Sequence, residues 1–557
     1  MGRTDVGHIR MKRDTRSDGQ RRHVVWATLL LITVTAYSPV LGHHFIESWD
    51  DTPAILTNPD YNPPTLGKLA HYWVIPPKDT FYVPVTYSLW GLLAMAGRSS
   101  APAHVPFNPA VFYAANLVSH AISAGLVFLI LWRFLPRRSA SDRWCLIAAW
   151  LGAAVFALHP LQVEGVATAW SVYTPLSGMF GFFAIWQFLV FSDALGNRNG
   201  NRSRPWTHYG LATLGLVLAL LTKPTAVAVP MVAGVMELTL GRSSFRTAVL
   251  TLGPWIGLSL VAIWLNEHSS PGATVFVPEP PFRPLVPLDA VGFYLMKVVA
   301  PVWLASDYGR SPRWLVEHPI AWLTCLVPLA VFAITWRMRR RAPWLLAAFG
   351  VFVAGLLPSI GIVPFDFQHY STVADRYAYV AMLGPAIAVA FVVVHFRVIA
   401  AGSVIALLGI LITLTVVQLG YWRDDWHLMA HTLKTNPTSV AARNGFQYLL
   451  TGWHDTHDFI APRSCTIDQP TLVRVGDLMM ARREWPIAAA AYRRAMLRGA
   501  PSAAINNRLG AALLADLDPK SAQAAFDDAL RIDPNNAEAR QGLARTELML
   551  GPQTAPL

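Results

Sequence analysis

A chain of 557 residues that is 54% hydrophobic and only 14% charged, with a mean hydropathy of +0.37, is too apolar for an ordinary soluble enzyme. Its formal net charge of +12 does not indicate nucleic-acid binding, because many basic residues lie in short runs between apolar segments, where they orient a membrane protein. We therefore expect an all-α, polytopic helical bundle that has the lipid bilayer, and no nucleic acid, as a partner.

The first 23 residues are basic and polar, and they precede the apolar run Val24–Leu41. A signal peptide has a similar pattern, but Gly42-His43-His44 is a poor cleavage site and the basic region is long. We expect a cytoplasmic tail at 1–23 and a retained first span, so that the membrane domain extends over 24–421.

The three cysteines do not form a chemical site. Cys145 and Cys325 fall inside apolar segments and Cys465 lies far downstream, so neither a metal-type spacing nor a disulfide framework is present. No redox chemistry is implied.

Eleven apolar runs are long enough to cross a bilayer, which takes about 20 residues with tolerance for shorter runs. They are Val24–Leu41, Val111–Leu135, Trp144–Leu158, Val166–Phe191, Tyr209–Leu221, Ala226–Leu240, Ala248–Leu265, Ala321–Trp336, Trp344–Leu357, Tyr377–His395 and Ser403–Tyr421. A further run, Val291–Leu304, is ambiguous, and its status decides on which side of the membrane the C-terminal residues lie.

The basic loops decide between the two topologies. The clusters Arg133–Arg143 and Arg198–Arg204 and the turn at Arg242 lie on the side of the N-terminus if the early spans alternate. The cluster Arg337–Arg341 joins them only if Val291–Leu304 is re-entrant or interfacial. We therefore expect eleven spans, a cytoplasmic N-terminus and an extracytoplasmic C-terminal domain.

The first outer loop, 41–108, carries the adjacent carboxylates Asp50 and Asp51 close to the end of the first span. Two like charges at a low-dielectric boundary repel each other and lose hydration unless a cation or a hydroxyl donor lies between them, so the doublet is a candidate site. The alternative is a solvated Asp-Asp turn after a helix. Further along the loop, Asp79–Gly97 is expected to form a helix along the outer interface.

Polar side chains recur within and at the outer ends of the spans. Asn116 and His120 lie four residues apart in the second span and are expected to make packing hydrogen bonds inside the bundle. A proline stops the helix after His159, which leaves this imidazole and the Glu164 carboxylate at the boundary, either as a helix-end cap or as a site. Lys223 lies in so tight a hairpin that its ammonium must be near the membrane boundary, where it either snorkels or holds an anionic substrate group.

The last two outer loops add three charged residues. Arg283 lies in a proline-rich, extended loop, and Asp307 follows the ambiguous run. Arg376 lies at the mouth of the tenth span, where its rigid fork suits a lipid-linked phosphate through bidentate bonds, with snorkelling as the alternative.

The C-terminal part turns polar and alanine-rich and contains an internal repeat. The matched pairs, each 34 residues apart, are Gly476 and Gly510, Ala488 and Ala522, Tyr492 and Phe526, and Ala495 and Ala529. This is the tetratricopeptide period, in which small residues let paired helices approach and an aromatic ring fills the gap between them. We expect a linker or degenerate repeat at 422–469 and a tetratricopeptide domain at 470–550, which recognises a partner and carries no chemistry of its own.

In this order, the motifs resemble the transmembrane and tetratricopeptide-containing (TMTC) O-mannosyltransferases and, more broadly, the GT-C membrane glycosyltransferases. The likeness covers nearly the whole chain and rests on Asp50-Asp51, Asn108-Pro109 with Asn116 and His120, His159-Pro160 with Glu164, Thr222-Lys223, the segment Trp303–Tyr308 (WLASDY), Leu357-Pro358, Ala374–Tyr377 (ADRY) and the repeats. Each motif is weak singly, but their order is specific.

The chain departs from the family pattern in three places. A basic residue usually follows the tyrosine of the first-loop helix, where this chain has Tyr82-Val83-Pro84. The family's Ser-Lys-Glu is Thr222-Lys223-Pro224 here, and the repeat array is much shorter. These departures bear on substrate identity more than on reaction class.

The resemblance implies that a polyprenyl-phosphate sugar, with mannose as the expected sugar, is the donor. The acceptor would be a Ser or Thr hydroxyl of an exported protein, reached on the outer face of the plasma (inner) membrane and recognised through the repeats. Asp50 or Asp51 would be the general base, and Arg376, with Lys223 as a second cation, would stabilise the departing phosphate. Further substrate contacts are expected from His159, Glu164, Arg283, Asp307, Tyr82 and Tyr377.

A divalent metal is the weaker alternative. His43, His44 and Glu47 could complete a metal site beside the doublet, but this segment does not supply a complete oxygen-ligand set. The GT-C enzymes that the chain resembles generally work without a metal. We therefore expect the lipid-linked donor and no metal.

Two other functions stay open at this point. One is a non-catalytic membrane scaffold or assembly protein that binds a partner through its repeats. The other is a GT-C transferase whose acceptor is a glycolipid or a cell-wall glycan. Nothing in the sequence separates these acceptors from a protein acceptor.

Overall fold

The structure is a computed structural model that describes residues 15–75, 80–98, 106–135, 141–196, 204–239, 244–269, 275–451 and 468–550. The regular elements of these residues are all helices. The same residues contain no β-strand, only two isolated β-bridges. They divide into two compact units. Of the described residues, the first unit contains 15–43, 53–98 and 106–423, and the second contains 44–52 and 424–550.

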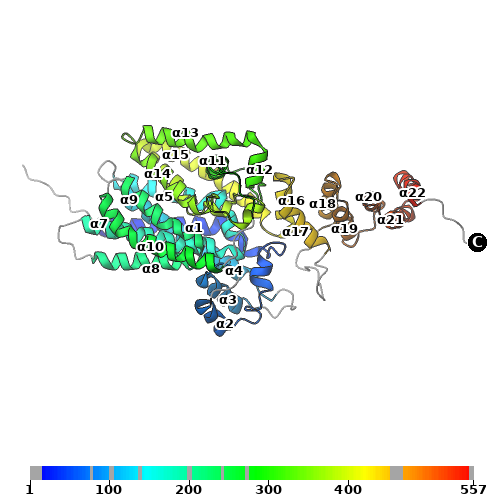
Figure 1. The fold of residues 1–557 in the computed structure, drawn as a ribbon, viewed down its shortest axis with the longest axis horizontal. Coiled ribbons are helices and arrows are strands. Elements are labelled where there is room, and N and C mark those ends of the chain that lie inside the picture. Colours follow the sequence, from blue (N-terminus) through cyan, green and yellow to red (C-terminus); the bar gives the residue numbers. More distant parts are fainter. Residues whose placement is uncertain are drawn as a thin grey trace, which may run out of the picture. The chain divides into compact units, whose positions relative to one another are not determined.

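Figure 1 labels most of the helices along the chain. Those of the first unit are α1 (Thr15–Tyr37), α2 (Leu66–Val74), α3 (Pro84–Ala96), α4 (Pro109–Phe134), α5 (Asp142–Leu158), α6 (Val163–Val166), α7 (Tyr173–Gly196), α8 (Pro205–Leu220), α9 (Ala228–Thr239), α10 (Phe245–Ser269), α11 (Leu285–Val299), α12 (Pro312–Glu317), α13 (Leu323–Arg337), α14 (Pro343–Leu356) and α15 (Leu383–Tyr421). Those of the second unit are α16 (Asp425–Thr435), α17 (Val440–Thr451), α18 (Gln469–Ala481), α19 (Trp485–Met496), α20 (Ala503–Ala515), α21 (Pro519–Ile532) and α22 (Ala537–Leu550).

Several predicted features fall on residues that the structure does not describe. These are residues 1–14 of the N-terminal tail, positions 136–140 of the first basic loop, positions 198–203 of the second, Arg242, Asp79, Cys465 and the predicted linker residues 452–467. The predicted interfacial helix of the first outer loop is helical over Pro84–Ala96.

By length and composition, six helical segments in the described residues could cross a membrane. They are His23–Gly42, Pro109–Phe134, Trp170–Leu195, Phe245–Ser269, Pro319–Arg337 and Leu383–Tyr421. Counting the bent pair Asp142–Leu158 and Pro160–Val166, which breaks by 52°, as one span makes seven. These long apolar helices indicate a multi-pass membrane protein, as the composition predicted.

The remaining predicted spans correspond to shorter or joined helices. Pro224–Thr239 and Pro343–Ser359 are apolar but shorter, and α8 has 16 residues. The last two predicted runs form the single element α15, whose 39 residues are interrupted at Arg397, where φ is 46° and ψ is −113°. The tenth run was predicted from Tyr377, but α15 begins at Leu383, because a turn of 3₁₀-helix, η9 (Asp375–Ala378), comes first.

Close helix packing forms the core of the first unit. A Cβ on Gly152 of α5 would lie 2.6 Å from the Ala386 carbonyl oxygen of α15, so only glycine permits this approach. Asn116 donates hydrogen bonds to the carbonyls of Val166 at 3.0 Å and Thr168 at 2.7 Å. The ring of His120 bonds Tyr379 and the Ala157 carbonyl. The predicted packing role of both side chains is confirmed.

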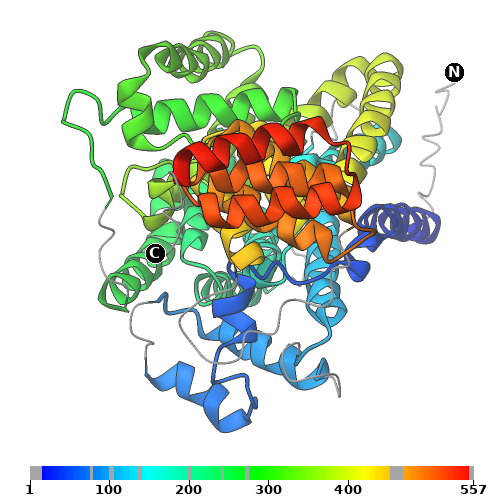
Figure 2. The same ribbon diagram turned by 90° about the vertical axis from the view of Figure 1, so that its right-hand side faces the viewer.

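The second unit consists of paired helices with a regular spacing. Helices α18, α20 and α22 begin at Gln469, Ala503 and Ala537, which are 34 residues apart. A Cβ on Gly476 would lie 2.4 Å from the Tyr492 ring, and one on Gly510 would lie 2.6 Å from the Phe526 ring, so the glycines and the rings of each repeat face each other. Figure 2 shows these helices, coloured orange to red, lying side by side. The predicted linker region contains the packed pair α16 and α17.

Candidate functional site

A buried ion pair joins two segments of the first unit. Glu164 comes from α6 and Arg376 from η9, and their side chains are 3% and 5% exposed. The backbone N–H of Arg376 donates to Glu164 Oε2 at 2.9 Å, and its guanidinium donates to Oε1. Both carboxylate oxygens therefore accept hydrogen bonds from one residue, which makes the pair strong and directional.

Aromatic rings enclose the guanidinium of Arg376. It lies 4.5 Å from the ring centroid of Phe367, 4.9 Å from Tyr377 and 5.4 Å from Trp170. Such rings attract a cation through their faces, and they exclude water, which strengthens every charge interaction nearby. Tyr377, predicted as a substrate contact, is thus part of the same cluster.

Lys223 brings a second cation to this cluster from the turn between α8 and η5 (Pro224–Val227). Its ammonium donates to Thr174 Oγ1 at 2.9 Å and lies 4.7 Å from the ring centroid of Tyr173. The residue as a whole is partly exposed, but its ammonium is enclosed. Burial, followed by the charge of Arg376, lowers the pKa of Lys223 to about 7, although Glu164 opposes both effects.

A second carboxyl beside the ion pair was not among the predicted site residues. Asp375 is 1% exposed, and its Oδ1 accepts a hydrogen bond from the hydroxyl of Tyr308 at 2.7 Å. Burial, followed by repulsion from Glu164, raises the pKa of Asp375 well above its usual range, while Tyr308, Lys297 and Arg376 oppose the rise. Burial at this position therefore opposes ionisation of the carboxyl.

His159 and Asp307 have structural contacts in the described residues. His159 Nδ1 accepts from the N–H of Leu161 at 3.2 Å, and Nε2 contacts the Val298 carbonyl at 3.1 Å. His159 is thus the N-cap of the 3₁₀ turn Pro160–Gln162 that follows α5. Asp307 Oδ1 accepts from the N–H of Gly309 at 2.8 Å and shapes a turn.

Tyr82 lies before the start of α3. Its hydroxyl donates to the Trp73 carbonyl at 3.1 Å and its N–H to Asn266 Oδ1 at 2.9 Å. These contacts tie the first outer loop to the end of α10. Two bonds near the start of α3, from Val85 N–H to the Leu221 carbonyl at 3.2 Å and from Thr86 Oγ1 to the Thr222 carbonyl at 2.7 Å, then fix the turn that carries Lys223.

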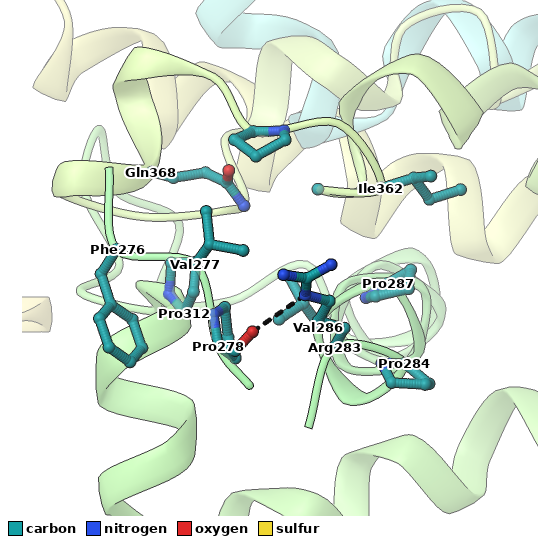
Figure 3. Close-up of a pocket in the computed structure, with 12 residues that line it drawn as sticks. Phe276, Val277, Pro278, Arg283, Pro284, Val286, Pro287, Pro312, Ile362 and Gln368 are labelled. Atoms are coloured by element: carbon teal, nitrogen blue, oxygen red, sulfur yellow. Dashed lines mark hydrogen bonds between the residues drawn. The ribbon is translucent and has the colours of Figure 1, made fainter. Parts of the chain in front are cut away.

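Arg283 lines a cavity of about 320 Å³ in the first unit. Its Nε donates to the Pro278 carbonyl at 3.0 Å, and its guanidinium points into the space bounded by Gln368 and Ile362 (Figure 3). The walls are otherwise mostly proline and aliphatic side chains. None of the contacts described for Arg283 joins it to the cluster of Glu164, Lys223 and Arg376.

The acidic doublet belongs to the second unit. Asp51 is completely buried, and its Oδ2 accepts from the N–H of Ile46 at 2.7 Å. A solvated turn, the alternative considered from the sequence, is therefore wrong for Asp51. Asp50 is only partly buried, so its carboxylate is the more accessible of the two.

The metal alternative rests on His43, His44 and Glu47. His43 belongs to the first unit and packs edge-on against Tyr113, whereas His44 and Glu47 belong to the second. Among the described residues, no group of three or more His, Cys, Asp or Glu side chains is arranged to hold a metal ion.

Four predicted residues therefore meet in one cluster: Glu164, Lys223, Arg376 and Tyr377. Asp375 and Tyr308 join them, and both lie inside motifs, ADRY and WLASDY, that the sequence analysis singled out. The rings of Trp170, Tyr173 and Phe367 had no such signal, because buried aromatic residues are common throughout a membrane protein.

Comparison with known proteins does not extend this picture. No protein-family model, no curated protein and no solved structure matches the chain. The chemistry of the cluster itself therefore carries the functional argument.

Proposed function

We propose that the chain is a membrane glycosyltransferase of the GT-C type. It takes a sugar, mannose in the first instance, from a polyprenyl phosphate and transfers it to a Ser or Thr hydroxyl of an exported protein. The proposal includes eleven spans, a cytoplasmic N-terminus, and a C-terminal tetratricopeptide domain on the outer side of the plasma (inner) membrane. The observation that supports it most is the enclosed cluster of Arg376, Lys223 and Glu164.

This cluster favours an anionic ligand for an electrostatic reason. Two cations share a buried volume with one ion-paired carboxylate, and burial and repulsion from Glu164 oppose ionisation of the second carboxyl, Asp375. A protonated Lys223 therefore adds positive charge beside Arg376, and that repulsion, after burial, is the second cause of the lowered pKa of Lys223. A phosphate would neutralise that charge and accept hydrogen bonds from the ammonium. Snorkelling of Lys223 to headgroups does not explain an enclosed ammonium.

In the reaction, a carboxylate of the doublet removes the proton of the acceptor hydroxyl as its oxygen attacks the anomeric carbon. The bond between that carbon and the phosphate oxygen breaks, and the electron pair leaves with the polyprenyl phosphate. Asp50 is the better base, because it is partly exposed whereas Asp51 is completely buried. Arg376 and Lys223 stabilise the charge that develops on the leaving phosphate.

The test is transfer by the purified full chain in lipid nanodiscs. Labelled polyprenyl-phosphate mannose, and the glucose and galactose analogues, are incubated with Ser/Thr-containing peptides from exported proteins, and products are identified by mass spectrometry. We expect transfer by the wild type, loss of at least about a hundredfold in Asp50→Asn, and retention in Arg133→Gln. Arg133 pairs with Asp193 at 2.8 Å outside the cluster, so it is a matched control. Wild-type transfer rates in Asp50→Asn and Asp51→Asn would remove the catalytic assignment.

A non-catalytic scaffold is the second candidate, because the paired helices of the second unit provide a binding surface without chemistry. A scaffold should still bind its partner when residues of the cluster around Arg376 are substituted. Co-purification of partners with wild type and with Lys223→Met separates the two functions. Unchanged partners together with no transfer to any acceptor favour the scaffold.

A further inference from the structure

The segment 44–52, which carries the acidic doublet, is held by a carboxylate from the start of α16. Asp425 accepts the backbone N–H of Glu47 at 3.0 Å and that of Ser48 at 2.7 Å, and it also accepts the hydroxyl of Ser48. Asp425 is 6% exposed. One side chain thus receives three hydrogen bonds from two consecutive residues that lie 377 and 378 positions away in the sequence.

The same segment is closed on itself around the doublet. Asp51 Oδ2 accepts from Ile46 N–H at 2.7 Å, the Trp49 N–H donates to the Ile46 carbonyl at 3.2 Å, and Thr52 Oγ1 donates to the Glu47 carbonyl at 2.7 Å. The chain between Ile46 and Thr52 is therefore a compact loop. Asp425 fixes the position of the first half of this loop. The hydrogen bonds within the loop then restrict the position of Asp50 as well.

Helix capping does not explain the contact. The N-cap of α16 is Asp424, whose side chain accepts the N–H of His427 at 3.0 Å. Asp425, the next residue, is left to face the loop. Its burial opposes ionisation and raises its pKa to about 6, although the bonds from Ser48 and Glu47 oppose the rise. A buried carboxylate at this position is unfavourable unless those bonds are made.

From this geometry we infer that Asp425 is a positioning residue, which holds the loop 44–52 on the second unit and so orients Asp50. The inference rests on the proposed function for the role of Asp50. The attachment itself does not depend on any activity.

Hydrogen–deuterium exchange on the full-length protein in nanodiscs tests the attachment. The variants are Asp425→Ala, Ser48→Ala and, as a matched control, Asp518→Ala, which removes a carboxylate that caps only its own helix α21. We expect peptides covering 44–52 to exchange roughly tenfold faster in Asp425→Ala and several-fold faster in Ser48→Ala. Peptides from α18 to α20 should keep their wild-type rates, and Asp518→Ala should leave 44–52 unchanged.

Ser48→Ala separates loss of the attachment from unfolding of the second unit, because this substitution does not change α16. Wild-type exchange over 44–52 in Ser48→Ala and Asp425→Ala overturns the attachment. If Asp425→Ala speeds exchange across all of 424–550, the variant unfolds and Ser48→Ala alone decides, with no change over 44–52 as the contradicting result.

Transfer kinetics test the positioning role separately. We expect Asp425→Ala to lower kcat roughly tenfold while leaving the KM for the donor nearly unchanged. Faster exchange over 44–52 with a wild-type kcat overturns positioning. A wild type that transfers no sugar defeats the proposed function instead, and the exchange result still decides the attachment.

Discussion

At the scale of single residues, the Glu164–Arg376 pair changes how a mutation at Arg376 must be interpreted. Both side chains are almost completely buried, so removing one leaves the other charged and unpaired. The sequence marks Arg376 by its place at a membrane mouth and Glu164 by the proline break before it. It does not pair them, because 212 residues separate the two and nothing local encodes the contact.

We expect Arg376→Gln or Glu164→Gln alone to destabilise the protein by about 3–5 kcal/mol, because each leaves an uncompensated buried charge. The double variant should recover most of that stability, since both charges are gone. Thermal unfolding in detergent measures all three. An enzyme that needs Arg376 for the phosphate stays inactive as the double variant. Full transfer by the stable double variant contradicts the phosphate role.

Lys223 gives the site a pH dependence of known sign. Its pKa of about 7 means that the neutral amine dominates above pH 7. Binding an anion then requires proton uptake, so donor affinity should fall towards tenfold per pH unit above about pH 7 and level off below it. Donor titrations from pH 6 to 9 measure the slope. Lys223→Arg, which stays charged, should remove it, and an unchanged slope in that variant assigns the effect elsewhere.

At the scale of elements, the loop 44–52 should respond to pH in the opposite sense from a usual carboxylate contact. Burial, followed by the charge of Asp425, raises the pKa of Glu47 to about 7, and burial raises that of Asp425 to about 6, with Asp424 adding to the rise. Tyr448 of α17 faces the same two acids. The docked loop therefore binds more protons than the released loop, and its stability is lost as pH rises through 6 to 7.

We expect exchange over 44–52, corrected for the intrinsic rate, to be several-fold faster at pH 8 than at pH 5.5. Glu47→Gln removes the repulsion and should slow exchange at pH 8 while flattening the pH dependence. Mass spectrometry of the same peptides measures both. Faster exchange in Glu47→Gln at pH 8 would show that the Glu47 carboxylate itself holds the loop.

Helix α15 shows what apolar periodicity finds and what it misses. Its two apolar runs were predicted as separate spans because His395 and Arg397 interrupt them, and the structure has its break at Arg397. The backbone angles there could not be predicted, since they depend on how the two halves pack. A non-glycine residue at φ 46° is strained, and Arg397 is exposed.

We expect Arg397→Gly to stabilise the protein by roughly 0.5–1 kcal/mol, because glycine adopts this conformation without a Cβ clash. Arg397→Ala, which keeps the Cβ, should bring no gain. Thermal unfolding of the two variants side by side measures the difference. Equal unfolding temperatures would mean that the backbone conformation at residue 397 does not destabilise the protein.

At the scale of the whole molecule, composition and the long apolar runs predicted a multi-pass helical membrane protein, since a run of about 20 apolar residues can cross a bilayer as a helix that satisfies its own backbone hydrogen bonds. The 34-residue period seen in the sequence equals the spacing of the helix starts Gln469, Ala503 and Ala537 in the second unit. The membership of the loop 44–52 in the second unit was not predictable, because it depends on Asp425, hundreds of residues away.

The proposed topology places the C-terminal helices and the Arg337–Arg341 turn on opposite sides of the membrane. In a cysteine-free background, we expect Ala504→Cys to react with a membrane-impermeant maleimide in intact spheroplasts. Arg340→Cys should react only after permeabilisation. Both positions are exposed, so access differs only by side. Labelling of both without permeabilisation would contradict the three spans proposed between these two positions.

The hydrogen bonds to Asp425 have a practical consequence for deletion experiments. Cutting the chain after Arg423 removes the helical repeats, but it also removes Asp425, which accepts the hydrogen bonds of the Glu47 and Ser48 amides. The segment that carries the doublet then loses these contacts. A shortened protein without activity would therefore say nothing about whether the repeats capture an acceptor. Swapping residues on the outer surface of α18 to α22, with α16 untouched, asks that question cleanly.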